Sequence, residues 1–343
     1  MRIRPAGLIG ILALALGAFG SVSAAKLING AGATFPYPIY SKWFDEFHKL
    51  HPDVRINYQS IGSGGGIRQV IEGTVDFGAT DGPMTDEQLA ETKTPILHLP
   101  TVLGAVVVTF NVAGLEQLRL TPDVLAGVFL GKITAWNDAA IAKENPGVAL
   151  PDAGIVPVHR SDGSGTTYVF TDYLTKVSPA WKETVGRGTA VSWPVGLGGK
   201  GNEGVTGLVK QTPNAMGYVE LAYAIQNKLP YAAIRNASGS FVMPSLASVT
   251  AAAGSASANM PPDFRVSITD PSAPDAYPIA SFTWLLIPTR YEDPATGRAL
   301  KQFLEWMLDG GQKLAPPLDY APLPDSVVAL ERTALDKIEV GGP

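Results

Sequence analysis

Short segments rich in small residues place hydroxyl groups beside backbone amides at three points in this sequence. Each lies just before a predicted helix, where the first N–H groups have no intrahelical partner and the helix dipole adds positive potential. Such a segment can hold a small anion with few cations. A Ser or Gly at this place is commonly only a cap, but three such segments exceed what capping requires. The residues concerned are Thr34, Phe35, Ser63, Ser164, Gly165 and Thr166.

An arginine and an aspartate precede the third segment. Arg160 lies four residues before Ser164, and its planar guanidinium suits two-point binding of an oxyanion. Asp162 either holds that guanidinium in place or forms a turn with Gly163, and the sequence leaves both interpretations open. We expect Arg160 to be the guanidinium of the site.

Asp81 indicates which anion would be selected. A carboxylate beside a bound anion repels it unless the ligand has a proton to donate, in which case it accepts a strong hydrogen bond. Phosphate carries a proton at physiological pH, whereas sulfate does not. An acceptor here would therefore favour phosphate by penalising sulfate. The segment from Asp81 to Pro83 is also a routine turn, and the sequence alone does not decide between the two.

Other chemistries find little support. The chain has no cysteine, which excludes disulfides, thiolate metal sites and cysteine nucleophiles. Residues 196–201 match G-x-G-x-x-G, but Trp193-Pro194 ends a central strand poorly and no clear helix follows, so we interpret them as a loop rather than a dinucleotide site. His48 and His51 are spaced as on a solvated helix face. We therefore expect no catalytic residue, no metal and no cofactor.

The elements that must position these residues follow an α/β pattern. Strands are predicted at 26–29, 54–59 and 75–79, each ending in a small-residue loop, and aromatic residues at helical spacing follow Pro38. Thr85 and Gln88 have the spacing of a capping box. This alternation predicts mostly parallel sheets flanked by helices.

The rest of the chain predicts a second lobe and a return to the first. Buried strands are expected at 97–100 and 102–110, a helix through Tyr168 to Tyr173, an exposed low-complexity loop at 251–262, and a returning strand at 279–287. Two lobes joined by two crossings form a hinge, and clefts between lobes are common ligand sites. The expected limits are 25–104 with 280–343 for lobe I, and 105–279 for lobe II.

The first 24 residues are predicted to direct export. Arg2 and Arg4 precede a short apolar run, and Val22-Ser23-Ala24 resembles a cleavage site. A retained anchor is the alternative, although the run is too short to span a bilayer stably. Cleavage near Ala24 removes two Arg and no acidic residue, which changes the net charge from −5 to −7. We predict a periplasmic protein that does not bind nucleic acid or an anionic membrane.

Five segments together resemble the periplasmic phosphate-binding protein family of the high-affinity phosphate ABC transporter, which has the type 2 periplasmic-binding-protein fold. The similarity runs from about residue 26 through 318–324, nearly the whole mature chain. Two neighbours depart from the common form, Gly64 and Thr80, where the family often has Ser. The segments are 30–36, 62–66, 75–81, 160–166 and 193–201.

The resemblance implies a monomeric, non-enzymatic receptor whose two lobes close on inorganic phosphate and deliver it to an inner-membrane permease with a cytoplasmic ATPase. Its implied ligands are Thr34, Phe35, Ser63, Asp81, Arg160, Ser164, Gly165 and Thr166, with Asp162 supporting the arginine. Two alternatives stay open. One is a receptor for arsenate, sulfate or molybdate, and the other is an exported phosphatase, for which the sequence offers no metal cluster and no evident base beside a nucleophile.

Overall fold

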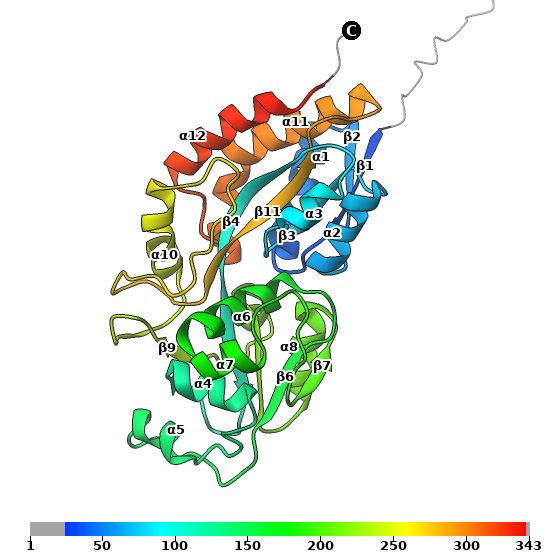
Figure 1. Ribbon diagram of the computed structural model, residues 1–343. Helices are drawn as coiled ribbons and strands as arrows, with labels where there is room; N and C mark the ends of the chain where they lie inside the picture. The colour runs from blue at the N-terminus through cyan, green and yellow to red at the C-terminus, as the bar shows by residue number, and fades with distance from the viewer. Residues whose placement is uncertain (1–24, 341–343) are drawn as a thin grey trace, which may run out of the picture.

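The chain forms two bodies of mixed α/β structure, one above the other in Figure 1, in a computed structural model that describes residues 25–340. The predicted export segment and its cleavage near Ala24 lie outside the described residues. Eight strands form a sheet in the order β2-β1-β3-β11-β4-β8-β6-β7, and β10-β9-β5 form a smaller one. The predicted two-lobed α/β fold is confirmed, with parallel pairs toward both ends of the large sheet and antiparallel pairs in its middle.

The N-terminal part of the upper body contains three strand–loop–helix units, as predicted. Helix α1 begins beside Pro38 and buries one aromatic face, which includes Trp43 and Phe47. The predicted capping box of Thr85 and Gln88 opens α3. In chain order the elements are β1 (Lys26–Gly32), α1 (Tyr37–Leu50), β2 (Val54–Ser60), α2 (Ser63–Glu72), β3 (Phe77–Thr80) and α3 (Asp86–Ala90).

One long strand, β4 (Ile96–Asn111), runs through both bodies (Figure 1). Two separate strands were expected here, and this prediction was wrong because Pro100 and Val102 both pair with β11, and a bulge at Thr101 of β4 keeps the strand continuous between them. The first part of β4 pairs with β11 (Ala280–Pro288) up to Ala105, and the remainder, from Val106, pairs with β8 (Ala215–Glu220). The strand therefore changes partners where the two bodies meet.

The lower body contains the middle of the chain. The predicted helix through Tyr168 and Tyr173 is α6, which follows strand β6 along the chain and packs against β4, β8 and α4. Its elements are β5 (Arg119–Leu120), α4 (Pro122–Phe129), α5 (Ala139–Glu144), β6 (Val156–Arg160), α6 (Gly165–Val177), α7 (Pro179–Thr184), β7 (Leu197–Gly199), α8 (Gly201–Gln211), β8, α9 (Leu221–Gln226), β9 (Ala233–Arg235) and β10 (Phe241–Val242).

The glycine-rich segment 196–201 differs from the expected loop. Residues Leu197–Gly199 form the edge strand β7, and helix α8 follows directly from Gly201, so the prediction that no helix follows was wrong. An edge position tolerates the preceding Trp193-Pro194, because a proline there interrupts no ladder bond on the open side. Gly201 has φ +72°, which allows the sharp turn from strand to helix.

The expected exposed loop at 251–262 is also corrected. Residues Leu246–Ala258 form helix α10, opened by a capping box of Ser245 and Ser248. Alanine is the strongest helix former, and the small side chains let α10 pack closely on β4, β11 and α12 (Asp325–Ala334). Ala252 and Ala253 are buried there, so low side-chain bulk did not mean exposure.

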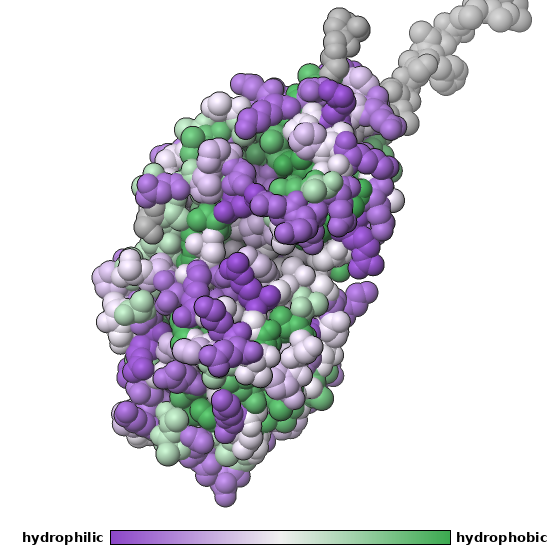
Figure 2. Space-filling model, viewed as in Figure 1, coloured by the Kyte–Doolittle hydropathy of each residue, from purple (hydrophilic) through white to green (hydrophobic). Residues whose placement is uncertain are grey.

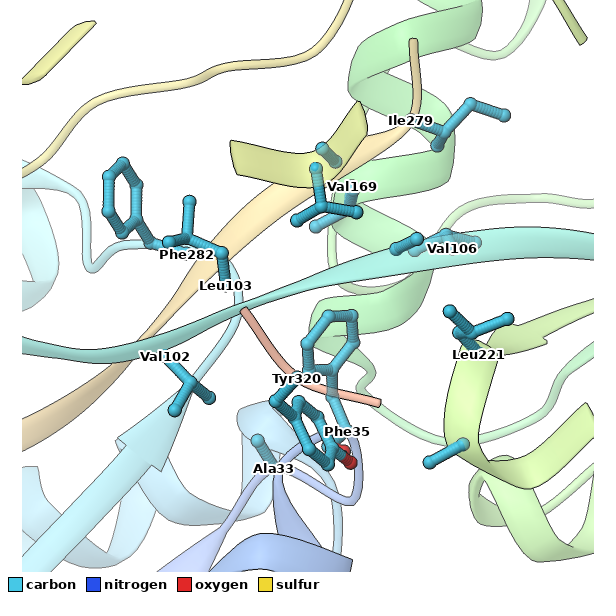
Figure 3. Packing of buried hydrophobic residues seen from close by; sticks show 14 of the residues in the cluster. Ala33, Phe35, Val102, Leu103, Val106, Val169, Leu221, Ile279, Phe282 and Tyr320 are labelled. Atoms are coloured by element: carbon cyan, nitrogen blue, oxygen red, sulfur yellow. The ribbon is translucent and has the colours of Figure 1, made fainter. Parts of the chain in front are cut away.

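The C-terminal part returns to the upper body. Beside α12 it contains α11 (Pro294–Asp309) and the short 3₁₀ turns Gly311–Leu314, Pro316–Leu318 and Leu335–Lys337. Figure 3 shows buried side chains where the bodies meet, with Phe35 and Tyr320 packed beside β4. Ala321 also pairs with Leu103 of β4. Among the residues that the structure describes, no helix is long and apolar enough to cross a membrane.

Candidate anion-binding site

The predicted site residues converge where the two bodies meet. The N-termini of α1 and α2 come from the upper body, and those of α6 and α8 come from the lower one. The polar side chains brought together are almost entirely buried, so the two bodies are closed over them. These side chains belong to Thr34, Ser63, Asp81, Arg160, Ser164, Thr166 and Asn202.

Figure 2 shows the molecule hollowed between the two bodies on one face. A cavity of about 770 Å³ lies there, and its lining includes Asp81, Tyr168, Arg187 and Arg265. Asp81 is nevertheless 1% exposed. The site thus lies beside a wide recess while its own polar atoms are shielded from water.

Arg160 lies at the end of β6 with its guanidinium held on two sides. Its Nε donates to Asp162 Oδ1 at 2.8 Å, and its Nη2 donates to Asp162 Oδ2 at 2.6 Å. Burial alone would raise the pKa of Asp162, but the hydrogen bonds and charge of Arg160 hold that pKa below its ordinary value. Asp162 also accepts the N–H of Gly201 at 3.1 Å. The remaining nitrogen, Nη1, is directed toward the site.

Two threonine hydroxyls, one from each body, lie against this guanidinium. Arg160 Nη1 is 3.2 Å from Thr34 Oγ1 and 3.4 Å from Thr166 Oγ1. Asn202 Nδ2 donates to the same two oxygens, at 2.8 and 3.1 Å. The carbonyl of Thr34 also accepts the hydroxyl of Tyr223 at 2.7 Å. These contacts make one side of the site a cluster of hydrogen-bond donors.

Asp81 forms the opposite side, at the end of β3. Its Oδ1 accepts the Thr283 hydroxyl at 2.8 Å, and its backbone N–H donates to Ser63 Oγ at 3.2 Å. Its Oδ2 is buried without a hydrogen-bond partner. Burial raises the pKa of Asp81 to about 7, and the Thr283 bond and the charge of Arg160 offset only part of that effect. The Oδ2 atom of this carboxylate therefore lacks a donor that would further stabilise the charged form.

The two bodies approach so closely that only glycine fits at several points. Gly64 donates its N–H to the carbonyl of Gly163 at 2.9 Å across the junction. A Cβ added at Gly165 would collide with Ser63, with the Asp81 carboxylate and with the Asp81 backbone. The glycines therefore let backbone amides from one body reach groups of the other.

Both serine hydroxyls accept a backbone N–H and keep a proton to donate, and Ser164 is also a helix cap. Ser164 Oγ accepts the N–H of Thr167 at 3.0 Å as the N-cap of α6, and Ser63 Oγ accepts from Asp81. An accepting hydroxyl still has its own hydrogen. The capping interpretation and the binding interpretation are thus compatible for Ser164, whereas Ser63 is the first residue of α2 and does not cap it. The amides of Gly165 and Thr166, in the first turn of α6, point the same way by helix geometry.

This arrangement is suited to a compact oxyanion with one protonated oxygen. Hydrogen-bond donors lie on one side of the site, and the unpartnered acceptor Asp81 Oδ2 lies on the other. The charge of Arg160 is already neutralised by its ion pair with Asp162. Short-range hydrogen bonds rather than net positive charge would then hold the ligand. Within residues 25–340, no group of three or more His, Asp or Glu side chains could hold a metal ion.

Sequence reasoning missed Asn202. The residue follows the G-x-G-x-x-G segment that we interpreted as a loop, and it is fully buried at the start of α8. The sequence did contain one signal, a glycine-rich turn followed by a segment that can form a helix. The N-terminus of such a helix carries free amides, which would have made Asn202 a candidate. Without the structure, nothing in the sequence connects this turn with Thr34.

Comparison with known protein families gives a match over most of the chain. Residues 20–310 match the family described as the PBP superfamily domain. The chain is 48% identical over 303 residues to the phosphate-binding protein PstS of Xylella fastidiosa, covering 88% of this chain and 82% of that protein. It is 46% identical over 320 residues to the protein of the same name from Pasteurella multocida, covering 93% and 92%.

Solved structures share the fold. A high-affinity periplasmic phosphate-binding protein bound with phosphate superposes with a TM-score of 0.73 and 22% identity, covering 89% of this chain and 93% of that one. The phosphate-binding protein from Stenotrophomonas maltophilia gives a TM-score of 0.68 at 20% identity, with coverages of 90% and 93%. At these identities the likeness concerns the architecture.

Proposed function

This chain belongs to the PBP superfamily and, within it, to the family of the phosphate-binding proteins named PstS, and from that premise we propose that it captures inorganic phosphate between its two lobes. The observation that carries the proposal is the pairing of a donor cluster around Arg160 with the unpartnered Oδ2 of Asp81. A monoprotonated phosphate satisfies both sides, because its bare oxygens accept and its hydroxyl donates.

The proposed ligands are Thr34, Phe35, Ser63, Asp81, Arg160, Ser164, Gly165 and Thr166, with Asp162 supporting the arginine. The donors include hydroxyls, amides and one guanidinium, and the burial of their side chains strengthens each bond. Sulfate has no proton for Asp81 and would meet a bare carboxylate oxygen. Arsenate has the same protons as phosphate, so this site offers no basis for separating the two.

We propose that the lobes, with limits of 25–104 and 280–343 for the first and 105–279 for the second, open and close about β4 and β11. The change of partner on β4 at Ala105 and Val106 supports a hinge at that place. Contacts across the junction, such as Thr34 with Asn202, exist only when the lobes are together. Release of phosphate therefore requires these contacts to break.

The protein would act as the periplasmic receptor of an ABC transporter. We propose that residues 1–24 direct export, that the mature monomer passes phosphate to an inner-membrane permease, and that a cytoplasmic ATPase supplies the energy. No bond of the ligand is made or broken in this role. Incubating the protein with a generic phosphomonoester should release no phosphate, and steady turnover would instead indicate a phosphatase.

The direct test is binding by the mature protein. Protein purified without added ligand should contain stoichiometric phosphate, and once stripped it should bind phosphate far more tightly than sulfate in calorimetry. Equal affinity for the two anions, or no phosphate binding, would contradict the proposal. In cells that lack their own receptor, the full chain should restore growth on limiting phosphate, whereas a chain without residues 1–24 should not.

A further inference from the structure

We propose that Asn202 is a positioning residue that fixes the protons of the Thr34 and Thr166 hydroxyls, so that both hydroxyls donate to the bound anion. The inference rests on the proposed function, since it concerns the same site. Asn202 itself need not touch the ligand. It acts through two hydroxyls that come from opposite lobes.

The orientation of the Asn202 amide follows from its third contact. Asn202 Oδ1 accepts the backbone N–H of Glu220 at 3.0 Å, at the end of β8. A backbone N–H can only donate, so the oxygen of the amide must face Glu220 and its NH₂ group must face the threonines. Both N–H bonds of that NH₂ group are then used, one toward Thr34 and one toward Thr166.

The hydroxyl of Thr166 has its acceptor capacity filled by these donors. Its Oγ1 lies 3.1 Å from Asn202 Nδ2 and 3.4 Å from Arg160 Nη1. A hydroxyl oxygen has two lone pairs and one hydrogen. With both lone pairs directed at donors, the hydrogen of Thr166 must be donated to another group.

Thr34 is constrained more strongly. Its Oγ1 accepts from Asn202 Nδ2 at 2.8 Å, from the Asn202 backbone N–H at 3.2 Å and from Arg160 Nη1 at 3.2 Å. Three donors around one oxygen leave no lone pair to accept from a ligand. The Thr34 hydroxyl can therefore only donate outward.

This fixed polarity complements Asp81. A free hydroxyl can turn to accept from a protonated ligand oxygen, which would let the anion bind in several orientations. Hydroxyls that can only donate require unprotonated oxygens on their side, and the proton of the ligand must then face Asp81. Asn202 thereby orients the bound anion as well as holding the lobes together.

Asn202 is well placed to do this without rearrangement. It is fully buried at the start of α8, and its backbone carbonyl accepts the Thr206 hydroxyl at 2.7 Å. The first turn of α8 fixes the backbone of Asn202 whether or not this hydroxyl is present, and Glu220 fixes its amide. Thr206 bonds to the same residue but away from the two threonine hydroxyls, which makes it a matched control.

The test measures the Kd for inorganic phosphate by calorimetry and the melting temperature of each stripped variant. Asn202→Ala removes both side-chain donors, which frees one lone pair on Thr166 and leaves Thr34 with two donors in place of three, so the Kd should rise at least about tenfold. Asn202→Asp keeps the shape but presents acceptors, so the hydroxyls turn toward it and the Kd should rise about a hundredfold. Thr206→Val should stay within about twofold of wild type.

A double-mutant cycle separates positioning from simple support. In a background of Thr34→Val with Thr166→Val, which has no hydroxyl to orient, Asn202→Ala should change the Kd by less than about twofold. A full tenfold effect in that background would show that Asn202 acts without the hydroxyls and would overturn the proposal. Should Asn202→Ala fail to fold, the same cycle with Asn202→Leu, which keeps the bulk of the side chain and adds no charge, decides the question.

The outcomes also distinguish this proposal from the proposed function. Wild-type protein that binds phosphate tightly, together with Asn202→Ala and Asn202→Asp variants of unchanged Kd, would overturn the role of Asn202 and leave the function standing. Wild-type protein that binds no phosphate would overturn both. The expected pattern is tight wild-type binding, graded losses in the two variants and loss of the effect in the double-valine background.

Discussion

The two sides of the site differ in whether their buried polar atoms have hydrogen-bond partners. On the donor side, Arg160, Thr34 and Asn202 are fixed by several contacts each, and every polar atom of their side chains has a partner. On the acceptor side, Asp81 Oδ2 is buried without one. The comparison suggests a division of tasks, and we propose that binding and selection are separate here. The donor side would hold any tetrahedral oxyanion, whereas the acceptor side would admit only one that carries a proton.

The largest effect is expected from removing the centre of the donor side. Arg160→Ala deletes the guanidinium and leaves Asp162 as an unpaired, half-buried charge, so phosphate affinity should fall by about 3 to 5 kcal/mol. Arg290→Ala is the matched control, because Arg290 forms an exposed ion pair with Glu339. Calorimetry on both variants measures the difference. Near-wild-type phosphate binding by Arg160→Ala would show that the donor side does not bind the ligand.

The next effect concerns the distance between the two sides. Gly165→Ala adds a methyl group that collides with Ser63 and Asp81, so the lobes cannot close fully and phosphate affinity should fall by about 1 to 3 kcal/mol. Gly207→Ala in α8, where a Cβ meets nothing, should bind normally. Small-angle scattering with phosphate should show the Gly165→Ala protein more open. A Gly165→Ala complex as compact as that of wild type, with unchanged phosphate affinity, would mean that the close approach of the two sides does not limit closure or binding.

A third variant tests the selection assigned to the acceptor side. Asp81→Asn replaces the bare carboxylate oxygen with an amide that can donate, so sulfate affinity should rise roughly tenfold or more while phosphate affinity falls less. Competition titrations with the two anions measure the ratio. Thr283→Val serves as control, since it removes the hydroxyl that bonds to Oδ1 and to the Thr80 carbonyl but keeps the carboxylate. Sulfate exclusion that survives Asp81→Asn would contradict the role of Asp81.

The smallest effect is a pH dependence of the ligand-free protein. Burial raises the pKa of Asp81 to about 7 from an ordinary value of 3.8. The unfolded chain releases this proton at lower pH than the folded one, so the contribution of Asp81 to stability is full below 3.8 and is lost as the pH rises to about 7.

This dependence is measured as a difference between melting curves. We expect the melting temperature of Asp81→Asn minus that of wild type to increase as the pH is raised from 4 to 7. The difference should level off above about pH 7. Asp45→Asn, at an exposed carboxylate on α1, should show no such trend. A difference in melting temperature that does not change with pH would mean that burial does not destabilise the charged form of Asp81.

Local signals could be predicted from the sequence, and distant contacts could not. Pro38 and the box of Thr85 and Gln88 act within a few residues, so their helices began where expected. The three helix-initiating segments were likewise visible as candidates because each is self-contained, and the structure brings all three together. Asn202 meets Thr34 across 168 positions, and no local pattern encodes such a contact.

The errors have the same origin. Helix α10 is rich in alanine and was mistaken for an exposed loop, because its burial depends on the faces of β4, β11 and α12 that it packs against. The strand β7 and helix α8 were missed because an edge strand tolerates a preceding proline that a central strand would not. In both cases the position of the element in the folded protein decided its structure, and the spacing of residues along the sequence does not show that position.

Strand β4 has a consequence for how the protein unfolds. Its residues are almost all buried, and one continuous ladder ties the sheet of the upper body to that of the lower. Melting either body would strip β4 of its partners and expose apolar residues that also belong to the other. We therefore expect the two bodies to unfold as one cooperative unit. Heating in a calorimeter should give a single transition, so that lobes proposed to separate during function would unfold together.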